Sequence, residues 1–299
     1  MTNGRTTVVL GTATPGGGFP VYGQAVAETI NEVDPSLHVE TRNTKGSTEN
    51  VPLLEAGQLD LGLVQGEVMH EALLGIGRPR AELYLLAAMY STPGMFVVRA
   101  DSPYRGIRDL VGQPVAFGAQ GSGLVILARY VLDGLGLDRD RDFKAVFLDK
   151  AGDGPAMVLD GRVAALWGGG LGWPGFTAVA QSPLGARFIV PDLDGIHRIH
   201  AKHAFLKMMM LPANAYPGQP ADLLSVGSWS FIVARRDLPD DVAYRLTRAL
   251  HRGESALAAR LPQARETTAA NTALAAPRAE AIHPGVRRYL GERGMLRPS

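Results

Sequence analysis

Three segments of the sequence place small residues directly before an expected helix, and there backbone groups could bind a ligand. They lie at residues 11–18, 46–48 and 118–123, each after an expected strand. Loops of this kind at the carboxyl ends of parallel strands leave N–H groups unpaired at helix starts. These groups and the helix dipole favour anions. For any one loop an ordinary turn or helix cap is the stronger interpretation, but the three together predict a ligand site at the strand ends of an α/β sheet.

A further glycine-rich segment, residues 168–175, formally fits the GxGxxG pattern. A dinucleotide site requires that turn to lead directly into a helix. Trp173 and Pro174 stand inside the turn, where the bulky ring would crowd a pyrophosphate. We therefore interpret the segment as a loop that lines a ligand cleft, with Trp167 or Trp173 as an apolar wall. Packing of either ring in the core is an equally good interpretation.

Residue types that carry catalysis or bind metals are sparse. The chain has no cysteine, which excludes disulfides, a thiolate nucleophile and cysteine-bound metals. His197, His200 and His203 are spaced by three and would share a helix face in pairs. Arg198 and Lys202 beside them would repel a cation, so a solvated basic stretch is the stronger interpretation. With no nucleophile elbow, Walker loop or nucleophile–base pair, the sequence favours binding over catalysis and predicts no enzyme activity, metal or cofactor.

The composition narrows the function classes further. The 299 residues suggest two domains or one large domain, and the formal net charge of +1 argues against binding to many phosphates. No apolar run reaches the ~18 residues that span a bilayer, and the first residues lack the apolar centre of a signal peptide. We therefore expect either a cytoplasmic protein or a mature exported form. Glycine is unusually frequent, at 36 residues, which predicts sharp turns or close backbone approach to a ligand.

Short strands alternate with helices through the first two thirds of the sequence. The alternation predicts parallel sheets with helices on both faces, and its restart near residue 100 predicts two lobes of similar plan. Ser47 or Thr48 would cap the helix after the second strand, and Gly57 would end it. The expected strands are 7–11, 39–41, 59–65, 83–90, 95–99, 114–118, 144–148, 163–167, 187–190 and 228–235, and the expected helices include 20–33, 67–74, 124–135, 155–160, 239–261 and 284–292.

Several short motifs stand in a fixed order along the chain. One is Gly46-Ser47-Thr48-Glu49-Asn50, which is followed by Leu59-Asp60-Leu61 and Val64-Gln65. Others are Val98-Arg99-Ala100-Asp101-Ser102, Asp109-Leu110-Val111-Gly112, Val115-Ala116-Phe117-Gly118, Gly121-Ser122-Gly123, Tyr216-Pro217-Gly218-Gln219, Leu238-Pro239-Asp240-Asp241 and His283-Pro284-Gly285. Their combination resembles the TAXI family, the solute receptors of TRAP transporters, and the resemblance covers most of the chain.

The resemblance implies a type II periplasmic-binding fold, in which two α/β lobes are joined by crossing strands and close on a solute in a cleft. Residues 1–99 would begin lobe 1, residues 100–221 would form lobe 2, and residues 222–299 would return to lobe 1 with a strand and C-terminal helices. The protein would be a periplasmic receptor whose export signal has been removed. It would deliver a small organic anion, a carboxylate, to membrane permease subunits driven by an ion gradient. Nucleic acid is not an expected partner.

Carried over residue by residue, the resemblance places ligand contacts in the small-residue loops and on apolar walls. Ser47, Thr48 and Ser122 would supply hydroxyl and N–H groups to a carboxylate, and Gln65 would orient an amide or hydroxyl. Tyr216 would cover the cleft. The expected ligand-binding residues are Gly17, Gly18, Phe19, Ser47, Thr48, Asn50, Gln65, Tyr90, Gln120, Gly121, Ser122, Gly123, Trp167, Trp173 and Tyr216.

Three places depart from the family pattern, and one of them is the stretch 168–175, which is unusually rich in glycine and tryptophan. Gly18 and Phe19 stand where members commonly have two adjacent tyrosines, and Leu124 stands where a threonine is common. These changes put glutamate or glutamine, which some members bind, in doubt and favour a less polar or bulkier solute. Two alternatives stay open. One is a receptor of an ATP-driven importer with the same fold, and the other is a cytoplasmic α/β enzyme that uses the cleft catalytically.

Overall fold

The computed structural model describes residues 5–296, and the chain divides into two compact units. Unit 1 takes in the residues up to Ala13, Phe19–Tyr90 and the residues from Trp229 onward. Unit 2 takes in Thr14–Gly18 and Ser91–Ser228. The junctions expected from the sequence, after residues 99 and 221, are fewer than ten residues from these divisions.

Strands β4 (Leu83–Arg99) and β10 (Leu223–Arg235) each contain residues of both units. The two strands predicted at 83–90 and 95–99 are therefore wrong as separate elements, because they form one strand of 17 residues. Pro93 and Gly94 resemble a turn in the sequence, yet an extended strand can hold both. A Cβ on Gly94 would lie 2.6 Å from the Trp167 ring. This glycine therefore allows close packing inside the strand.

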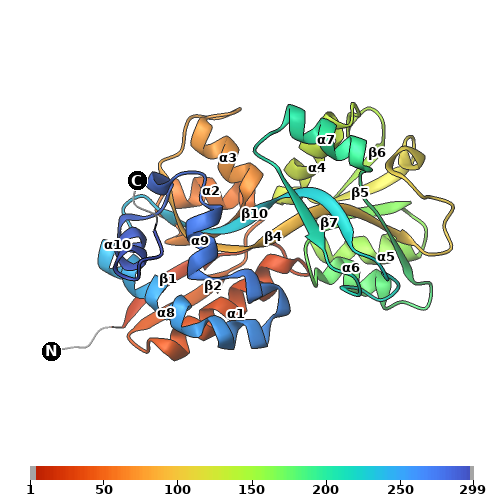
Figure 1. Cartoon of the computed structure of the whole chain (residues 1–299). Coiled ribbons are helices and arrows are strands. Elements are labelled where there is room, and N and C mark those ends of the chain that lie inside the picture. Colours follow the sequence, from red (N-terminus) through yellow and green to blue (C-terminus); the bar gives the residue numbers. More distant parts are fainter. Residues whose placement is uncertain (1–4, 297–299) are drawn as a thin grey trace. The chain divides into compact units, whose positions relative to one another are not determined.

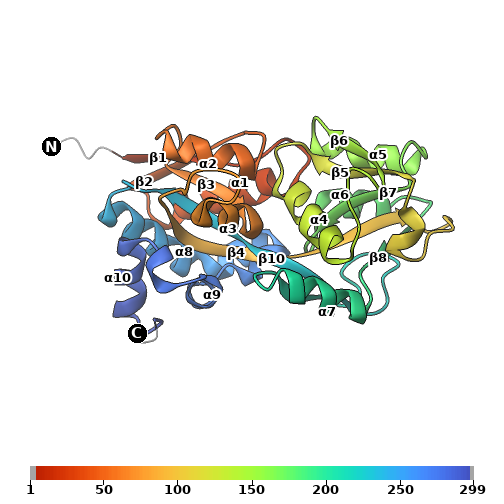
Figure 2. The same cartoon turned by 90° about the horizontal axis from the view of Figure 1, so that it is seen from above.

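Unit 1 is built on strands in the order β2-β1-β3-β10. β1 (Thr6–Gly11) pairs in parallel with β2 (Leu37–Arg42) and β3 (Leu61–Gln65), while β10 runs antiparallel to β3. The apolar core of this unit packs helices α1, α8 and α10 against one face of these strands, and α10 lies along α8 (Figures 1 and 2). Its helices are α1 (Gly18–Val33), α2 (Ser47–Glu55), α3 (Gly66–Leu74), α8 (Asp240–Arg260), α9 (Ala269–Ala275) and α10 (Pro284–Glu292), with short 3-10 turns η3 (Pro262–Glu266) and η4 (Ala279–Ala281).

Unit 2 is built on strands in the order β4-β7-β5-β6, with β8 paired to β4 and β9 paired to β10. β5 is parallel to β6 and β7, whereas β4 is antiparallel to β7 and β8. Helices α4 and α7 pack together, as do α5 and α6 (Figure 1). The elements are β5 (Pro114–Ala119), β6 (Lys144–Leu148), β7 (Ala165–Gly169), β8 (Ala186–Ile189), β9 (Lys207–Leu211), α4 (Gly123–Gly134), α5 (Gly154–Leu159), α6 (Pro174–Ala180), α7 (Leu193–Lys202), η1 (Ile107–Leu110) and η2 (Ala151–Asp153).

The α/β class predicted from the sequence is confirmed, and the expected parallel strand pairs are present together with antiparallel ones. β1 pairs in parallel with β2 and β3, β5 pairs in parallel with β6 and β7, and β4 and β10 make the antiparallel pairs. Gly57 follows α2 with φ +66, in the left-handed region, as predicted for a helix end. Strand β9 has no counterpart among the predicted strands. None of the helices within residues 5–296 is long and apolar enough to cross a membrane.

The buried His283 makes the stability of unit 1 depend on pH. Its Nδ1 accepts a hydrogen bond from the Gly285 N–H at 3.2 Å, and its Nε2 donates to the Leu238 carbonyl at 3.0 Å. Burial holds the pKa of His283 below its ordinary value, although the Asp240 carboxylate opposes this shift. The unfolded chain therefore binds more protons than the folded chain below the ordinary histidine pKa of about 6.5.

We expect the free energy of unfolding to fall as the pH drops below about 6.5 toward the lower pKa of folded His283. Urea unfolding at pH 7.5 and 5.5 measures this loss. The His283→Gln variant cannot titrate, so its loss between the two pH values should be smaller than that of the wild type. An equal loss in both proteins would show that His283 does not cause it.

Candidate functional site

Ser47 lies at the carboxyl end of β3 in unit 1, but it does not cap α2. The residue before the helix is Gly46, whose φ of 117° favours glycine and which has no side chain to cap the helix. The predicted cap at Ser47 or Thr48 is therefore wrong. The buried Ser47 hydroxyl instead accepts a hydrogen bond from the Gln65 N–H at 3.1 Å, which joins the start of α2 to the end of β3. The neighbouring Thr48 is exposed.

The Asn50 side chain is buried and bonded to the backbone on several sides. Its Nδ2 donates to the Thr12 carbonyl at 2.9 Å and to the Leu63 carbonyl at 2.8 Å. Its Oδ1 accepts from the Thr44 hydroxyl at 2.8 Å. The amide thereby ties α2 to the ends of β1 and β3. These bonds use the groups that a ligand would need, so Asn50 supports the loops rather than contacting a solute.

Two aromatic candidates of unit 1 lie at the edge of its apolar core. Tyr90 is nearly buried, and its ring packs edge-on against Tyr22 with 5.2 Å between centroids. Phe19 is half-buried against the same core. The Tyr22 hydroxyl bonds Thr267 at 2.9 Å, which fixes the ring on which Tyr90 rests. Tyr90 and Phe19 are thus held on rigid elements, where they can form apolar walls.

In unit 2, Ser122 caps helix α4 at the carboxyl end of β5. Its hydroxyl accepts a hydrogen bond from the Leu124 N–H at 3.2 Å. Gly118, near the end of β5, has a φ of 108°, which favours glycine. Ser122 and Gly121 are half-buried, Gln120 is exposed and Gly123 is buried. This loop therefore presents a hydroxyl and the start of a 12-residue helix at a strand end.

The glycines after β1 lie close to another loop of unit 2. A Cβ on Gly16 would lie 2.5 Å from the Cα of Gly152, and Gly16 has a φ of +83. The Ala151 N–H donates to the Thr14 hydroxyl at 3.3 Å. The next residues, Gly17 and Gly18, are buried. Close contact between two backbones thus accounts for Gly16.

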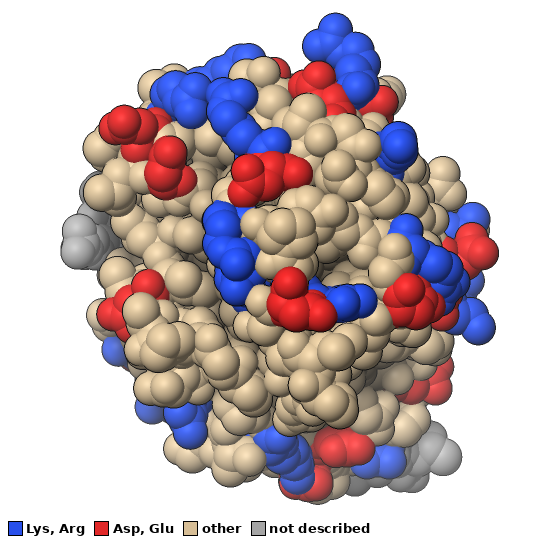
Figure 3. Space-filling view, turned by 90° about the vertical axis from the view of Figure 1, so that its right-hand side faces the viewer, with Lys and Arg blue, Asp and Glu red and all other residues tan. Residues whose placement is uncertain are grey.

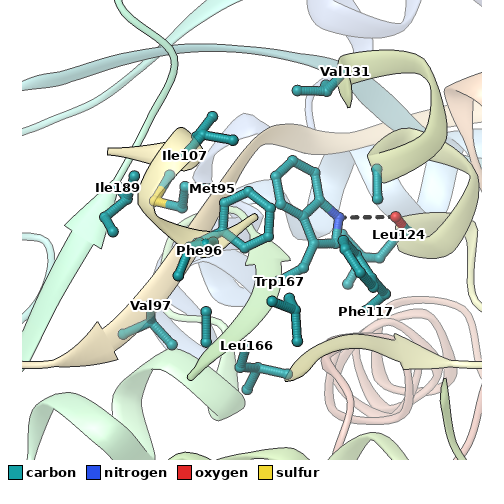
Figure 4. Packing of buried hydrophobic residues seen from close by; sticks show 14 of the residues in the cluster. Met95, Phe96, Val97, Ile107, Phe117, Leu124, Val131, Leu166, Trp167 and Ile189 are labelled. Atoms are coloured by element: carbon teal, nitrogen blue, oxygen red, sulfur yellow. Dashed lines mark hydrogen bonds between the residues drawn. The ribbon is translucent and has the colours of Figure 1, made fainter. Parts of the chain in front are cut away.

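Trp167 is a core residue of unit 2. It is fully buried, and its Nε1 donates to the Leu124 carbonyl at 2.9 Å. Its ring centroid is 4.7 Å from that of Phe96, and Figure 4 shows the indole enclosed by apolar side chains. Of the two interpretations left open by the sequence, core packing is the one the structure supports.

Trp173 and Tyr216 hold the glycine-rich turn together. The Trp173 N–H donates to the Tyr216 hydroxyl, which in turn donates to the Gly170 carbonyl, both at 2.7 Å. Both rings are buried, and burial raises the pKa of the Tyr216 hydroxyl above its usual range. A Cβ on Gly168 or Gly175 would lie 2.5 or 2.4 Å from the Trp173 ring. These two glycines therefore make room for an indole, and Tyr216 pins the turn instead of covering a cleft.

The side chains of His197, His200 and His203 do not gather around one point. His197 and His200 are exposed on α7, and the His200 Nδ1 lies 3.2 Å from the Leu206 carbonyl. The His203 Nε2 lies 2.6 Å from an Asp133 oxygen. Within residues 5–296, no three His, Asp or Glu side chains are placed to hold a metal ion. Basic and acidic side chains are interspersed over the face drawn in Figure 3, so that face has no extended basic area for a polyanion.

The structure buries two hydroxyl side chains that sequence reasoning did not single out. Ser230 on β10 is fully buried beside Gln65, and Thr92 on β4 is nearly buried in unit 2. Within the described part of the chain, neither hydroxyl has a hydrogen-bond partner. A serine in an apolar stretch carries no signal of its own. Only the pairing of β3 with β10 reveals its position.

Residues 10–294 match the NMT1-like family, and the chain belongs to this family. Its structure is similar to that of a protein from Bordetella bronchiseptica RB50, with a TM-score of 0.60 and 16% identity over 97% of this chain and 98% of that one. It is also similar to the periplasmic aliphatic sulphonate binding protein SsuA from Escherichia coli (TM-score 0.53, 19% identity, 96% and 83% covered). A TctC solute binding protein from Polaromonas gives a TM-score of 0.52 at 17% identity, with 97% and 99% covered. The chain thus has the two-lobed α/β fold of periplasmic binding proteins.

Proposed function

We propose that the protein is an extracytoplasmic solute receptor of a TRAP-type transporter of the TAXI kind. It captures a small organic anion, a carboxylate, by closing its lobes and delivers the anion to a membrane permease without chemical conversion. The observation that carries the proposal is the Ser122 loop, which places a hydroxyl and the first turn of α4 at the end of β5. Membership of the NMT1-like family and the binding-protein fold support the receptor role.

The start of α4 suits an anion because its first N–H groups lack partners within the helix and carry partial positive charge. The net charge of +1 means that attraction of an anion must come from such local groups rather than from the whole surface. The ligand-binding residues in this proposal are Gly17, Gly18, Phe19, Ser47, Thr48, Gln65, Tyr90 and residues 120–123. The proposal leaves out Asn50, Trp167 and Tyr216, whose side-chain polar groups are bonded within the protein. It also leaves out Trp173, whose buried ring packs against Gly168 and Gly175.

The receptor role is tested by thermal unfolding of ligand-stripped protein with amino acids, dicarboxylates and aromatic acids. A ligand at 100 times its Kd should stabilise the folded protein by about 2.7 kcal/mol through mass action. If only uncharged solutes bind, the proposal that the solute is an anion is contradicted. Conversion of a bound compound would favour the enzyme alternative.

An ATP-driven importer is the second candidate, because the substrate binding protein of an amino acid ABC transporter shares the fold, with a TM-score of 0.51. Permease genes beside the receptor gene distinguish the two transporter types. Membrane subunits with a nucleotide-binding partner would contradict the TRAP assignment.

Ser122→Ala should weaken binding of the acid found in this screen. Loss of a hydrogen bond to a charged group costs about 1.5–3 kcal/mol, or roughly tenfold to more than a hundredfold in Kd. The matched control is Asp192→Ala, since Asp192 caps α7 in the same unit by accepting from the Gly195 N–H at 2.7 Å. Calorimetric titration should show weaker binding only for the Ser122 variant. An unchanged Kd would remove Ser122 from the site.

A further inference from the structure

The row of side chains between β3 and β10 changes from apolar to polar at one end. Leu61 lies opposite Ala234 and Leu63 lies opposite Ile232, and these two pairs belong to the core of unit 1. The next pair on the same face is Gln65 opposite Ser230. Directly opposed residues of an antiparallel pair have Cβ atoms about 4.5–5.5 Å apart, so the two polar side chains are neighbours.

Both polar side chains are buried. Gln65 is 4% exposed and Ser230 is 0% exposed. Within residues 5–296, the Gln65 Nε2 and the Ser230 Oγ have no hydrogen-bond partner. Buried polar groups in native proteins are nearly always bonded, because an unmade bond leaves the cost of desolvation uncompensated. Two adjacent donors without acceptors therefore indicate that an acceptor is supplied from outside the chain.

Other buried polar side chains nearby differ in this respect. The Asn50 amide is bonded to the backbone at 2.8–2.9 Å, and the Ser225 hydroxyl, on the same strand as Ser230, donates to the Gly94 carbonyl at 2.5 Å. The unsatisfied pair also stands at the carboxyl end of β3, where the Gln65 N–H is held by the first residue of α2. Open α/β sheets bind ligands at such strand ends.

We propose that Gln65 and Ser230 together bind one oxygen-bearing group of the solute, a carboxylate or a carbonyl, and that Ser230 is a specificity-determining residue. The inference rests on the proposed receptor function and concerns residues of unit 1 alone. The Gln65 amide donates one hydrogen bond and the Ser230 hydroxyl donates another. Since both donors are neutral, they suit an acid and its amide alike.

The test uses Ser230→Ala and Gln65→Met, which remove the donors with little change in volume. Ser225→Ala is the matched control, because it removes a buried hydroxyl that is already bonded. Titrations use two acid–amide pairs, L-glutamate with L-glutamine and benzoate with benzamide. Thermal unfolding of each ligand-free protein is measured in parallel.

For the probe that the wild type binds, we expect the Ser230 and Gln65 variants to raise the Kd about tenfold each. Their ligand-free Tm should equal or exceed that of the wild type, because each removes an unsatisfied buried group. Ser225→Ala should lower the Tm and leave the Kd unchanged. Binding of the acid alone identifies the group as a carboxylate, and binding of the amide as well identifies it as a carbonyl oxygen.

Two results would overturn the inference while leaving the receptor function intact. One is a wild-type Kd in both variants for a probe that the wild type binds. The other is a ligand-free Tm that falls as far as that of Ser225→Ala, which would show that the donors are already bonded in the free protein. Failure of the wild type to bind any of the four probes or any acid of the wider screen would overturn the receptor function together with this inference.

Discussion

Replacing Trp167 with alanine is expected to lower the free energy of unfolding by about 3–5 kcal/mol. The side chain is fully buried, so its removal leaves a large cavity in the core of unit 2. It also leaves the Leu124 carbonyl without the 2.9 Å hydrogen bond from Nε1. Gly94, which packs against the ring, has no side chain that could move into the cavity. Urea unfolding measures the loss.

Trp167→Phe is the matched control for this prediction. It keeps most of the ring and loses the N–H donor, so we expect a smaller loss of about 1–3 kcal/mol. A Trp167→Ala protein with wild-type stability and lost solute binding would contradict the core role. That result would instead support the alternative in which Trp167 forms an apolar wall of the ligand cleft.

Replacing Asn50 with alanine is expected to lower the free energy of unfolding by about 3–5 kcal/mol. The change removes the amide donor to the buried Thr12 and Leu63 carbonyls and the acceptor of the half-buried Thr44 hydroxyl, and it leaves a cavity. Each lost partner of a buried polar group costs about 1–3 kcal/mol. Because the amide joins α2 to β1 and β3, water cannot easily replace it without loosening the contact between the helix and these strands.

Asn31→Ala is the control for the Asn50 variant. Asn31 also makes two backbone bonds, to the Val39 carbonyl at 2.9 Å and from the Val39 N–H at 2.7 Å, but its side chain is only partly buried. Water can replace these bonds, so a loss of about 1 kcal/mol is expected. Equal losses in the two variants would show that burial of Asn50 adds nothing. An Asn50→Ala protein that keeps its stability but no longer binds the solute would show that Asn50 belongs to the ligand site.

The element pattern was predictable because it depends on local sequence. Apolar runs such as residues 59–65 and 114–118 became strands, and periodic segments such as 239–261 became helices, with shifts of a few residues at their ends. The errors arise where tertiary contacts override local signals. Pro93 and Gly94 are residues that favour a turn, yet both lie within β4. Close packing of Gly94 against the Trp167 ring holds the chain extended there.

The candidate site was predictable only in part. The loops at Gly46 and Ser122 follow from small residues before helices, and they stand at strand ends. The role of the aromatic residues could not be predicted from the sequence, because a tryptophan beside glycines fits a cleft wall and a packed turn equally well. Gly168 and Gly175 proved to make room for Trp173. Ser230 could not be found from the sequence, because its role depends on strand register with Gln65, far away in the chain.

Native mass spectrometry of the protein as purified, and after incubation with a panel of small acids, tests the receptor function most directly. We predict one additional small organic acid per chain, lost when the protein is unfolded and regained when that acid is added back. A protein that shows only the mass of its own chain, before and after incubation with amino acids, dicarboxylates and aromatic acids, would contradict the account.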